Sequence, residues 1–373
     1  MKRIRICYFN AWADRHETAE AYLARLPALD LRARVANPKD TSLLRKARLD
    51  CDWYGENLRC FAAMSTADIE VAGAFSCGPA GILEYAQSAS NAGVESWFLC
   101  MGHQPQTLGA VAGRVFGALR QARVRTLFYA FDEASRAMPC FRDIAPHLDV
   151  LIHDESPLDP AAAAALRPDC VRVHRSWVAN FLPFSVPFNE EPEKKILFLG
   201  SQLGLTPHRQ RQIEFLKKRF KDRFVPSTDH SVGIADRGSL NRLKVGLCPE
   251  GRKFTTAAMS ATHTDRPFWS GCLGLVPVSE NSTAGNRLEE LAAAELILRY
   301  PHGDLNALAQ CCERALETPT EERRRIYEHF NRHETIGTVA AAAIAAHANA
   351  VPIAPARRSQ PGEAGGEGFS AGV

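Results

Sequence analysis

Several features that would assign a protein quickly to a class are missing from this sequence. No apolar run approaches the ~18 residues that a membrane-spanning helix needs. The charges nearly balance, with a formal net charge of +3, so the strongly basic character of a nucleic-acid-binding domain is absent. The N-terminus leads from Lys2 and Arg3 into a short strand-like segment, without the longer apolar stretch of a signal peptide. We therefore expect a soluble, cytoplasmic protein with no nucleic-acid partner.

The cysteines also lack a recognisable spacing. The chain contains eleven of them, but no two form a C-x-x-C pair. This absence argues against a zinc ribbon and against a thioredoxin-type redox site. The number is odd and several cysteines lie inside apolar runs, so we interpret them as buried, reduced thiols.

The first half of the chain has the pattern of a parallel α/β sheet. Short apolar segments alternate there with stretches that have helical character. Strands are predicted at 4–10, 69–75, 96–100, 125–131, 149–153 and 171–173, and helices at 17–26, 79–92 and 111–120. The charged segment 37–60 has no clear period, and we interpret it as an excursion from the sheet.

A linker follows, and the same pattern then starts again. Three prolines and an acidic end mark the segment 181–192 as a connection between two domains. Strands are predicted beyond it at 195–199, 223–226, 245–248, 276–278 and 295–300, and helices at 207–220, 268–275 and 304–317. A long, broken helix is predicted over 320–350. The chain's 373 residues are enough for two domains of ordinary size.

The stretch from Lys244 to Asn281 combines these elements with charged residues. A short apolar strand ends in a charged turn, Asp265 and Arg266 precede an apolar helix, and a second strand ends at Glu280. In open parallel sheets, ligands bind at the carboxyl edge of the strands. A basic side chain beside helix N-terminal amides at that edge suits a phosphate group.

The order of residues in this stretch carries a family resemblance. The pattern C-P-E-G, followed by D-R-x-F-W-x-G-C-x-G-L-V-P-V-S-E, resembles the donor-binding half of a GT-B glycosyltransferase. It is similar to the exostosin-like and fucosyltransferase-like branches in particular. A looser likeness extends from Lys194 to about Tyr300, and the N-terminal half shows none. The resemblance implies an enzyme of the hexosyltransferase type that moves a sugar from a nucleotide-sugar donor to a glycan, lipid-linked or small-molecule acceptor.

The same resemblance implies a particular architecture. Two Rossmann-like, doubly wound α/β domains would face each other across a cleft. We expect an acceptor-side domain over 1–182, a linker over 183–193, a donor-binding domain over 194–318 and a C-terminal helix over 319–351 that returns to the first domain. Residues 352–373 are rich in Pro, Gly, Ser and Ala, so we expect a disordered tail there.

Breaking the donor's glycosidic bond builds negative charge on a diphosphate, which helix amides and basic side chains can stabilise. Candidate donor-binding residues follow the strands of the second domain: Ser201, Arg209, Glu250, Lys253, Asp265, Arg266, Glu280 and Asn281. Alternative interpretations remain for some of them. Glu280 and Asn281 could only cap a turn, and Arg266 could pair with Asp265.

Metal and cofactor signals are weak. The D-x-D pair Asp50-Cys51-Asp52 lies in the mixed segment and does not follow a strand. We therefore expect no metal, and no cofactor besides the nucleotide sugar that serves as substrate.

The reaction is expected to invert the configuration of the sugar. Many retaining GT-B enzymes carry two glutamates eight positions apart, but Ala258 and Leu288 stand eight residues after Glu250 and Glu280. An inverting enzyme needs a general base on the acceptor side. The candidates at strand ends of the first domain are Asp14, His16, His103, Asp132 and Glu133. Asp14 could instead cap the helix that follows it.

Two other functions remain compatible with the resemblance. One is a sugar-nucleotide epimerase of the same fold, and the other is a catalytically silent protein that binds a sugar nucleotide or a partner. Contact with the inner face of a membrane also remains open, because many sugar acceptors are lipid-linked. The sequence carries no signal of an oligomeric state.

Overall fold

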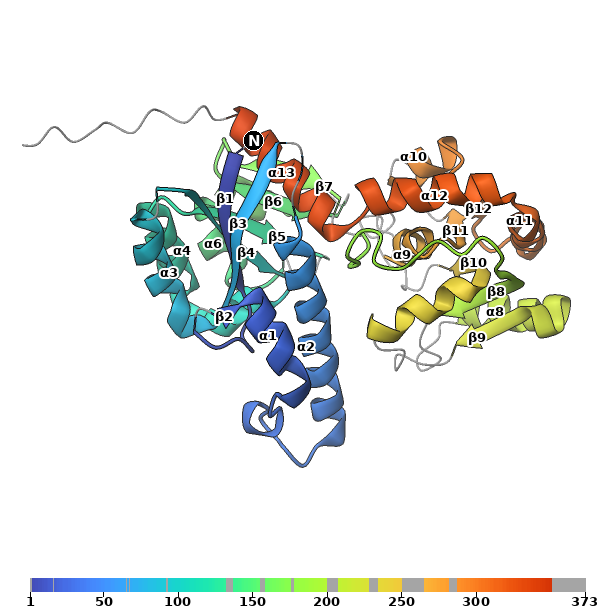
Figure 1. Cartoon of the computed structure of the whole chain (residues 1–373), viewed down its shortest axis with the longest axis horizontal. Coiled ribbons are helices and arrows are strands. Elements are labelled where there is room, and N and C mark those ends of the chain that lie inside the picture. Colours follow the sequence, from blue (N-terminus) through green and yellow to red (C-terminus); the bar gives the residue numbers. More distant parts are fainter. Residues whose placement is uncertain are drawn as a thin grey trace, which may run out of the picture.

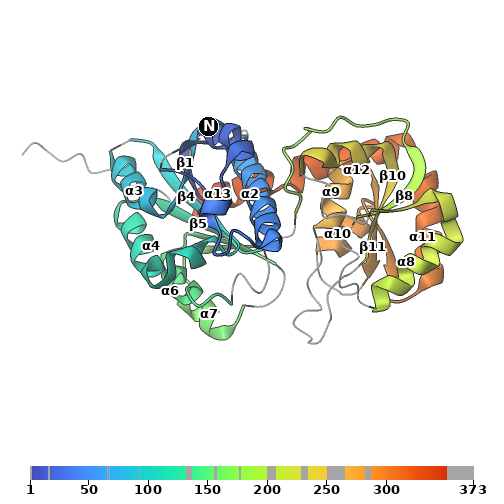
Figure 2. The same ribbon diagram turned by 90° about the horizontal axis from the view of Figure 1, so that it is seen from below.

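Two α/β units lie side by side in the computed structural model, each built on its own sheet (Figures 1 and 2). The structure describes residues 2–15, 17–64, 66, 68–91, 93–131, 137–154, 158–175, 178–199, 207–227, 234–249, 265–281 and 287–350. None of the helices in these ranges is long and apolar enough to cross a bilayer.

The first sheet has the strand order β2-β3-β1-β4-β5-β6-β7. Its strands are β1 (Lys2–Phe9), β2 (Glu17–Thr18), β3 (Ile69–Cys77), β4 (Glu95–Met101), β5 (Arg125–Tyr129), β6 (Val150–His153) and β7 (Val171–His174). All neighbours pair in parallel except the two-residue β2, which is antiparallel to β3. The helices are α1 (Ala19–Arg25), α2 (Thr41–Ala62), α3 (Ile82–Ser90), α4 (Ala112–Gln121), α6 (Phe141–Ile144) and α7 (Pro160–Ala165).

Alternation along β1 creates a core on each face of this sheet. Ile4, Ile6 and Tyr8 belong to the core that also contains residues of α2, whereas Cys7 and Phe9 belong to the core that contains residues of α3 and α4. Successive side chains of a strand point to opposite faces, so a strand covered on both sides becomes apolar throughout.

The second sheet is entirely parallel and has the order β12-β11-β10-β8-β9. Its strands are β8 (Glu193–Leu199), β9 (Phe224–Ser227), β10 (Leu243–Cys248), β11 (Val276–Asn281) and β12 (Leu298–Pro301). Its helices are α8 (Pro207–Phe220), α9 (Arg266–Cys272), α10 (Arg287–Ala293) and α11 (Leu305–Glu317). The expected fold class, two Rossmann-like α/β units, is confirmed by the two sheets.

The sequence pattern predicts no helix or strand in the segment 37–60, and this prediction is wrong. It forms most of α2, a helix of 22 residues. Asp40 caps it, because its carboxylate accepts hydrogen bonds from the amides of Ser42 at 2.9 Å and Leu43 at 3.3 Å. Leu58 and Phe61 bury its inner face.

The chain returns to the first unit at its C-terminal end. The helix predicted over 320–350 is two helices, α12 (Thr320–His333) and α13 (Ile336–Ala350), separated at Glu334 and Thr335. α12 packs on α9 of the second unit, whereas α13 packs on α2, β6 and β7 of the first (Figure 1). The expected domain boundaries stay a prediction, and the expected tail, 352–373, lies outside the described residues.

Glu334 joins the segments that meet at this crossing. Its side chain is fully buried, and Arg175 at the end of the first unit lies 2.6 Å from its Oε2. Arg287 of α10 donates to its Oε1, and His329 Nε2 lies 3.5 Å from the same oxygen. Its backbone carbonyl accepts from the amide of Ala179 at 2.9 Å. Burial alone would raise the pKa of Glu334, but His329, Arg175 and Arg287 outweigh it and lower that pKa to about 2.

The contact between α13 and α2 can be tested at Gly337. A Cβ at this position would lie 2.7 Å from the backbone carbonyl oxygen of Cys60. We expect Gly337→Ala to lower the free energy of unfolding by about 1–3 kcal/mol, because a backbone atom cannot move aside cheaply. Thermal or denaturant unfolding measures the change.

Gly117→Ala is the matched control within α4. There the added Cβ would lie 3.5 Å from the His147 ring, an ordinary contact, so alanine should be neutral or stabilise by up to about 1 kcal/mol. Equal stability of the two variants would contradict the close approach of α13 to α2.

The charge on Glu334 should make stability depend on pH. Because its folded pKa is lowered, its contribution is present above the ordinary value of 4.5 and is lost as the pH falls toward about 2. We expect Glu334→Gln to melt at a lower temperature than wild type at neutral pH, and the difference to shrink as the solution is acidified. Melting curves recorded across this range measure it. Glu328→Gln is the control, since Glu328 forms only a partly exposed pair with Arg332 at 3.2 Å. A constant difference for Glu334→Gln across the range would argue against the charge.

Candidate functional site

The carboxyl edge of the second sheet brings together polar residues from separate elements. Glu280 lies near the end of β11, His302 follows β12, and His208 and Arg209 occupy the first turn of α8. Pro249 follows β10, and Arg266 begins α9. Parallel strands place all their carboxyl ends on one side, so these six residues converge there despite their separation in sequence.

Glu280 is the most buried of the predicted donor-binding residues that the structure describes. Its side chain has no exposed surface. Oε1 accepts hydrogen bonds from Gln212 Nε2 and from the Gly303 amide, both at 3.0 Å. His208 Nε2 lies 2.6 Å from the same oxygen, and His302 Nδ1 lies 3.0 Å from it. The carboxylate therefore connects α8 to the segment after β12 and does more than cap a turn.

Arg209 ties the start of α8 to the end of β10. It is buried, and its Nη2 donates to the carbonyl of Pro249 at 3.3 Å. A cation in the first turn of a helix opposes the helix dipole, so this position is better suited to a nearby anion than to water alone.

Arg266 is the first residue of α9 and is half-buried. Its Nη1 is shielded from water and has no hydrogen-bond partner within the described ranges. Asp265 occupies the N-cap position but makes no side-chain capping bond, and within the same ranges no ion pair joins it to Arg266. The alternative that the two residues neutralise each other is therefore not supported. Asn281, at the end of β11, is exposed.

The other predicted donor-binding residues cannot be placed. Ser201, Glu250 and Lys253 lie outside the described residues.

Asp14 and His103 are the predicted acceptor-side residues within the described ranges. Both are exposed, Asp14 in the loop after β1 and His103 in the turn after β4. The carboxylate of Asp14 lies 3.3 Å from Arg25 Nη2. The cap of α1 is Thr18, whose hydroxyl accepts from the Ala21 amide at 3.1 Å, so the alternative that Asp14 caps this helix was wrong. His16, Asp132 and Glu133 lie outside the described residues.

The structure adds polar residues that the sequence did not single out. His153 and Asp154 follow each other at the end of β6 and are both fully buried. The ring of His153 lies 4.3 Å from that of His174 at the end of β7. Asp154 directly follows a predicted strand, a signal that could have marked it. The sequence places His208 among the basic residues in the first turn of a predicted helix, but it gives no signal for His302, and only the tertiary structure brings both histidines to Glu280.

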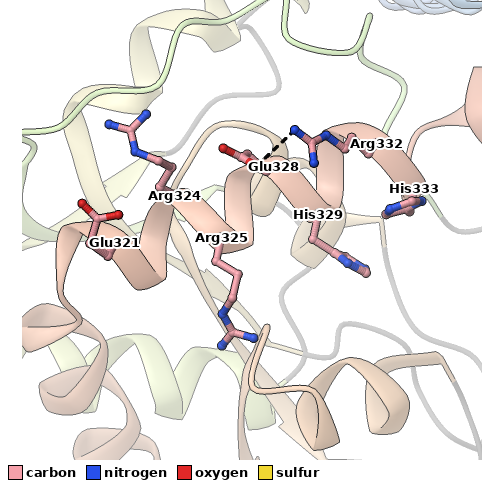
Figure 3. A pocket seen from close by; sticks show the side chains of 7 residues that line it. All are labelled: Glu321, Arg324, Arg325, Glu328, His329, Arg332 and His333. Carbon is pink, nitrogen blue, oxygen red and sulfur yellow. Dashed lines mark ion pairs between the residues drawn. The ribbon is translucent and has the colours of Figure 1, made fainter.

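A hollow of about 380 Å³ lies along α12, lined by Glu321, Arg324, Arg325, Glu328, His329, Arg332 and His333. Its side chains project from one helix and do not converge on a common point (Figure 3). Arg324 contacts Glu190, and Arg325 donates to the carbonyls of Ala294 and Glu295 at 3.0 and 3.2 Å. These arginines hold α12 to its own unit, so we do not assign a ligand site to this hollow.

No protein-family model matches the sequence, and no curated protein matches it significantly. Similar solved structures include AviGT4, a glycosyltransferase involved in avilamycin A biosynthesis, with a TM-score of 0.44, 11% identity and coverage of 92% of this chain and 97% of that chain. The lipopolysaccharide outer core galactosyltransferase WaaB has a TM-score of 0.41 and 10% identity, and the match covers 93% of this chain and 99% of that chain. The trehalose-6-phosphate synthase OtsA has a TM-score of 0.40 and 11% identity, and the match covers 94% of this chain and 97% of that chain. All three TM-scores lie below 0.5, so the similarities carry no conclusion about the activity of this chain.

Proposed function

We propose that this protein is a glycosyltransferase of the hexosyltransferase type, which moves a sugar from a nucleotide-sugar donor to a glycan, lipid-linked or small-molecule acceptor. The motif from Lys244 to Asn281 supports this proposal, and so does the arrangement of two Rossmann-like units. The assignment to an exostosin-like or fucosyltransferase-like branch remains a prediction from that motif. A lipid-linked acceptor would bring the protein to a membrane surface.

The observation that carries the proposal is the environment of Arg266. A guanidinium N–H that is removed from water and lacks an acceptor costs free energy. Arg266 stands at the carboxyl edge of the sheet, where ligands of parallel α/β sheets bind. A diphosphate oxygen at this place would supply the acceptor that Nη1 lacks, and the guanidinium fork suits a phosphate. Arg209 lies at the same edge and adds a second positive charge.

The proposed chemistry follows from where charge develops. As the bond between the sugar and the diphosphate breaks, the leaving group gains negative charge, and its hydrogen bonds to Arg266 strengthen. This stabilisation needs no metal ion held by a D-x-D pair. We assign an inverting course, because neither Glu250 nor Glu280 is followed by a glutamate eight residues later. The general base would come from the first unit, where Asp14, His16, His103, Asp132 and Glu133 remain the candidates.

A screen of nucleotide sugars tests the proposal directly. A bound ligand raises the melting temperature with the logarithm of its concentration over its dissociation constant. We expect one of the UDP, GDP, CMP or dTDP sugars to stabilise the protein, and slow hydrolysis of that donor to follow. Stabilisation without hydrolysis or transfer would favour the silent binding protein, whereas conversion of the donor into an epimer would favour the epimerase. Failure of every nucleotide to bind would remove the donor-site assignment.

Arg266→Ala should weaken binding of the nucleotide found by this screen. A hydrogen bond between a guanidinium and a charged oxygen contributes roughly 1.5–3 kcal/mol, and affinity changes tenfold for every ~1.4 kcal/mol. We therefore expect the dissociation constant to rise about tenfold or more, as measured by calorimetric titration. Arg266→Lys should rescue binding only in part, because lysine keeps the charge and loses the planar fork.

Arg219→Ala provides the matched control. Arg219 lies in the last turn of α8, is exposed and pairs with Glu313 at 2.8 Å, far along the helix from its first turn. Its replacement should leave nucleotide affinity unchanged. A well-folded Arg266→Ala variant with the affinity of wild type would contradict the assignment of the phosphate contact to Arg266, and Arg209 or another residue would then be the candidate.

A further inference from the structure

The cluster around Glu280 has the composition of a metal site. The potential ligand atoms of His208, Glu280 and His302 all lie within 4.8 Å of one another. We propose that these three side chains bind a divalent transition-metal ion of the zinc class. Two imidazoles with one carboxylate form a ligand set that suits Zn²⁺ and its neighbours in the first transition row.

The three ligands come from segments that the fold holds in place. His208 belongs to the first turn of α8, Glu280 to β11, and His302 to the turn between β12 and α11. The two imidazole rings lie nearly parallel, with their centroids 4.4 Å apart and an interplanar angle of 23°. Nε2 of His208 and Nδ1 of His302 lie 2.6 and 3.0 Å from Oε1 of Glu280. A bound ion would take the place of the protons on these two nitrogens, and both nitrogens and the carboxylate could then coordinate it.

The hydrogen bonds of Glu280 are distributed very unevenly. Four nitrogen atoms lie within hydrogen-bonding distance of Oε1, from His208, Gln212, His302 and Gly303. Oε2 is equally buried and has no partner within the described ranges. A carboxylate oxygen has about two lone pairs, so Oε1 has more nitrogen neighbours than it can accept hydrogen bonds from, whereas Oε2 has no donor among the described residues.

The charge of Glu280 also calls for a cation. A buried carboxylate is costly unless it is paired or coordinates a metal. Within the described part of the chain, the ion-pair partners of Glu280 are His208 and His302, which carry charge only when protonated. A divalent ion would neutralise the carboxylate at any pH at which the histidines are neutral, and a bond to Oε2 would satisfy the oxygen that has no donor.

Surrounding residues would orient these ligands, as they do in known metal sites. Gln212 is buried, and its Nε2 lies 3.0 Å from Glu280 Oε1 and 3.1 Å from His208 Nε2. Tyr300 donates to Gln212 Oε1 at 3.3 Å and holds that amide in place. The side chain of His302 is 52% exposed, which leaves a route from solvent and room for at least one non-protein ligand.

This metal site is separate from the D-x-D pair considered in the sequence and from the contact proposed for Arg266. It does not require that the protein be a glycosyltransferase, because an ion would bind to the three ligands without a nucleotide present. The two proposals can therefore fail independently.

The test is a titration of the full-length protein with Co²⁺, followed by visible absorption, and with Zn²⁺, followed by calorimetry, both without nucleotide. Wild type should bind one ion saturably, and Zn²⁺ should raise its melting temperature. His302→Ala should weaken binding at least tenfold and abolish most of that thermal shift. Because His302 is largely exposed, this variant should fold. His208→Ala should have the same effect.

His333→Ala is the matched control. His329 and His333 form a second pair of neighbouring histidines, with ring centroids 5.1 Å apart, on α12 beside Glu334. The replacement of His333 should leave the binding of Co²⁺ and Zn²⁺ unchanged if Glu280 holds the ion. No saturable binding by wild type would overturn the proposal. So would binding that survives in His302→Ala and is lost in His333→Ala.

Discussion

The buried carboxylate of Glu334 is the contact on which the arrangement of the two units depends. The apolar core on the α2 face of the first sheet is continuous with the core of the second unit. Glu334 adds a buried, charged contact to it at the break between α12 and α13. It receives Arg175 from the first unit and Arg287 from the second, while its carbonyl pairs with Ala179. The charge survives burial because two guanidinium groups and His329 compensate for the lost water.

A second buried carboxylate, Glu280, is compensated in a different way. Glu334 is paired with arginines, whereas the ion-pair partners of Glu280 in the described ranges are histidines. That difference is the physical basis for assigning a cation to Glu280 and none to Glu334. Arg266 presents the opposite imbalance, because its Nη1 is buried and has no acceptor in the part of the chain that the structure describes. The carboxyl edge of the second sheet thus contains two charged groups, the Glu280 carboxylate, which a cation would stabilise, and the Arg266 guanidinium, which an anion would stabilise.

Much of the fold could be read from local patterns. The apolar segments that became β4, β8 and β10 were found nearly at their true bounds, and α8 was predicted over the same residues that it occupies. The long helix α2 was not found, because its outer face is so charged that the buried positions of Leu58 and Phe61 did not produce a clear period. The alternative that Asp14 caps α1 was wrong because Asp14 and Thr18 are both good capping residues, and only the backbone path decides between them.

For the candidate site too, some features follow from local sequence and others only from the tertiary structure. The sequence by itself determined that Asp265, Arg266 and Glu280 lie at strand and helix ends, because strand length and the position of apolar runs are local properties. It also determined the two-unit α/β class, since the alternation of elements repeats on both sides of the linker. Only the tertiary structure decided that Glu280 is buried and lies between His208 and His302. Those residues belong to segments far apart in the chain, and the pairing of β11 with β10 and β12, together with the packing of α8 and α11, is what brings them together.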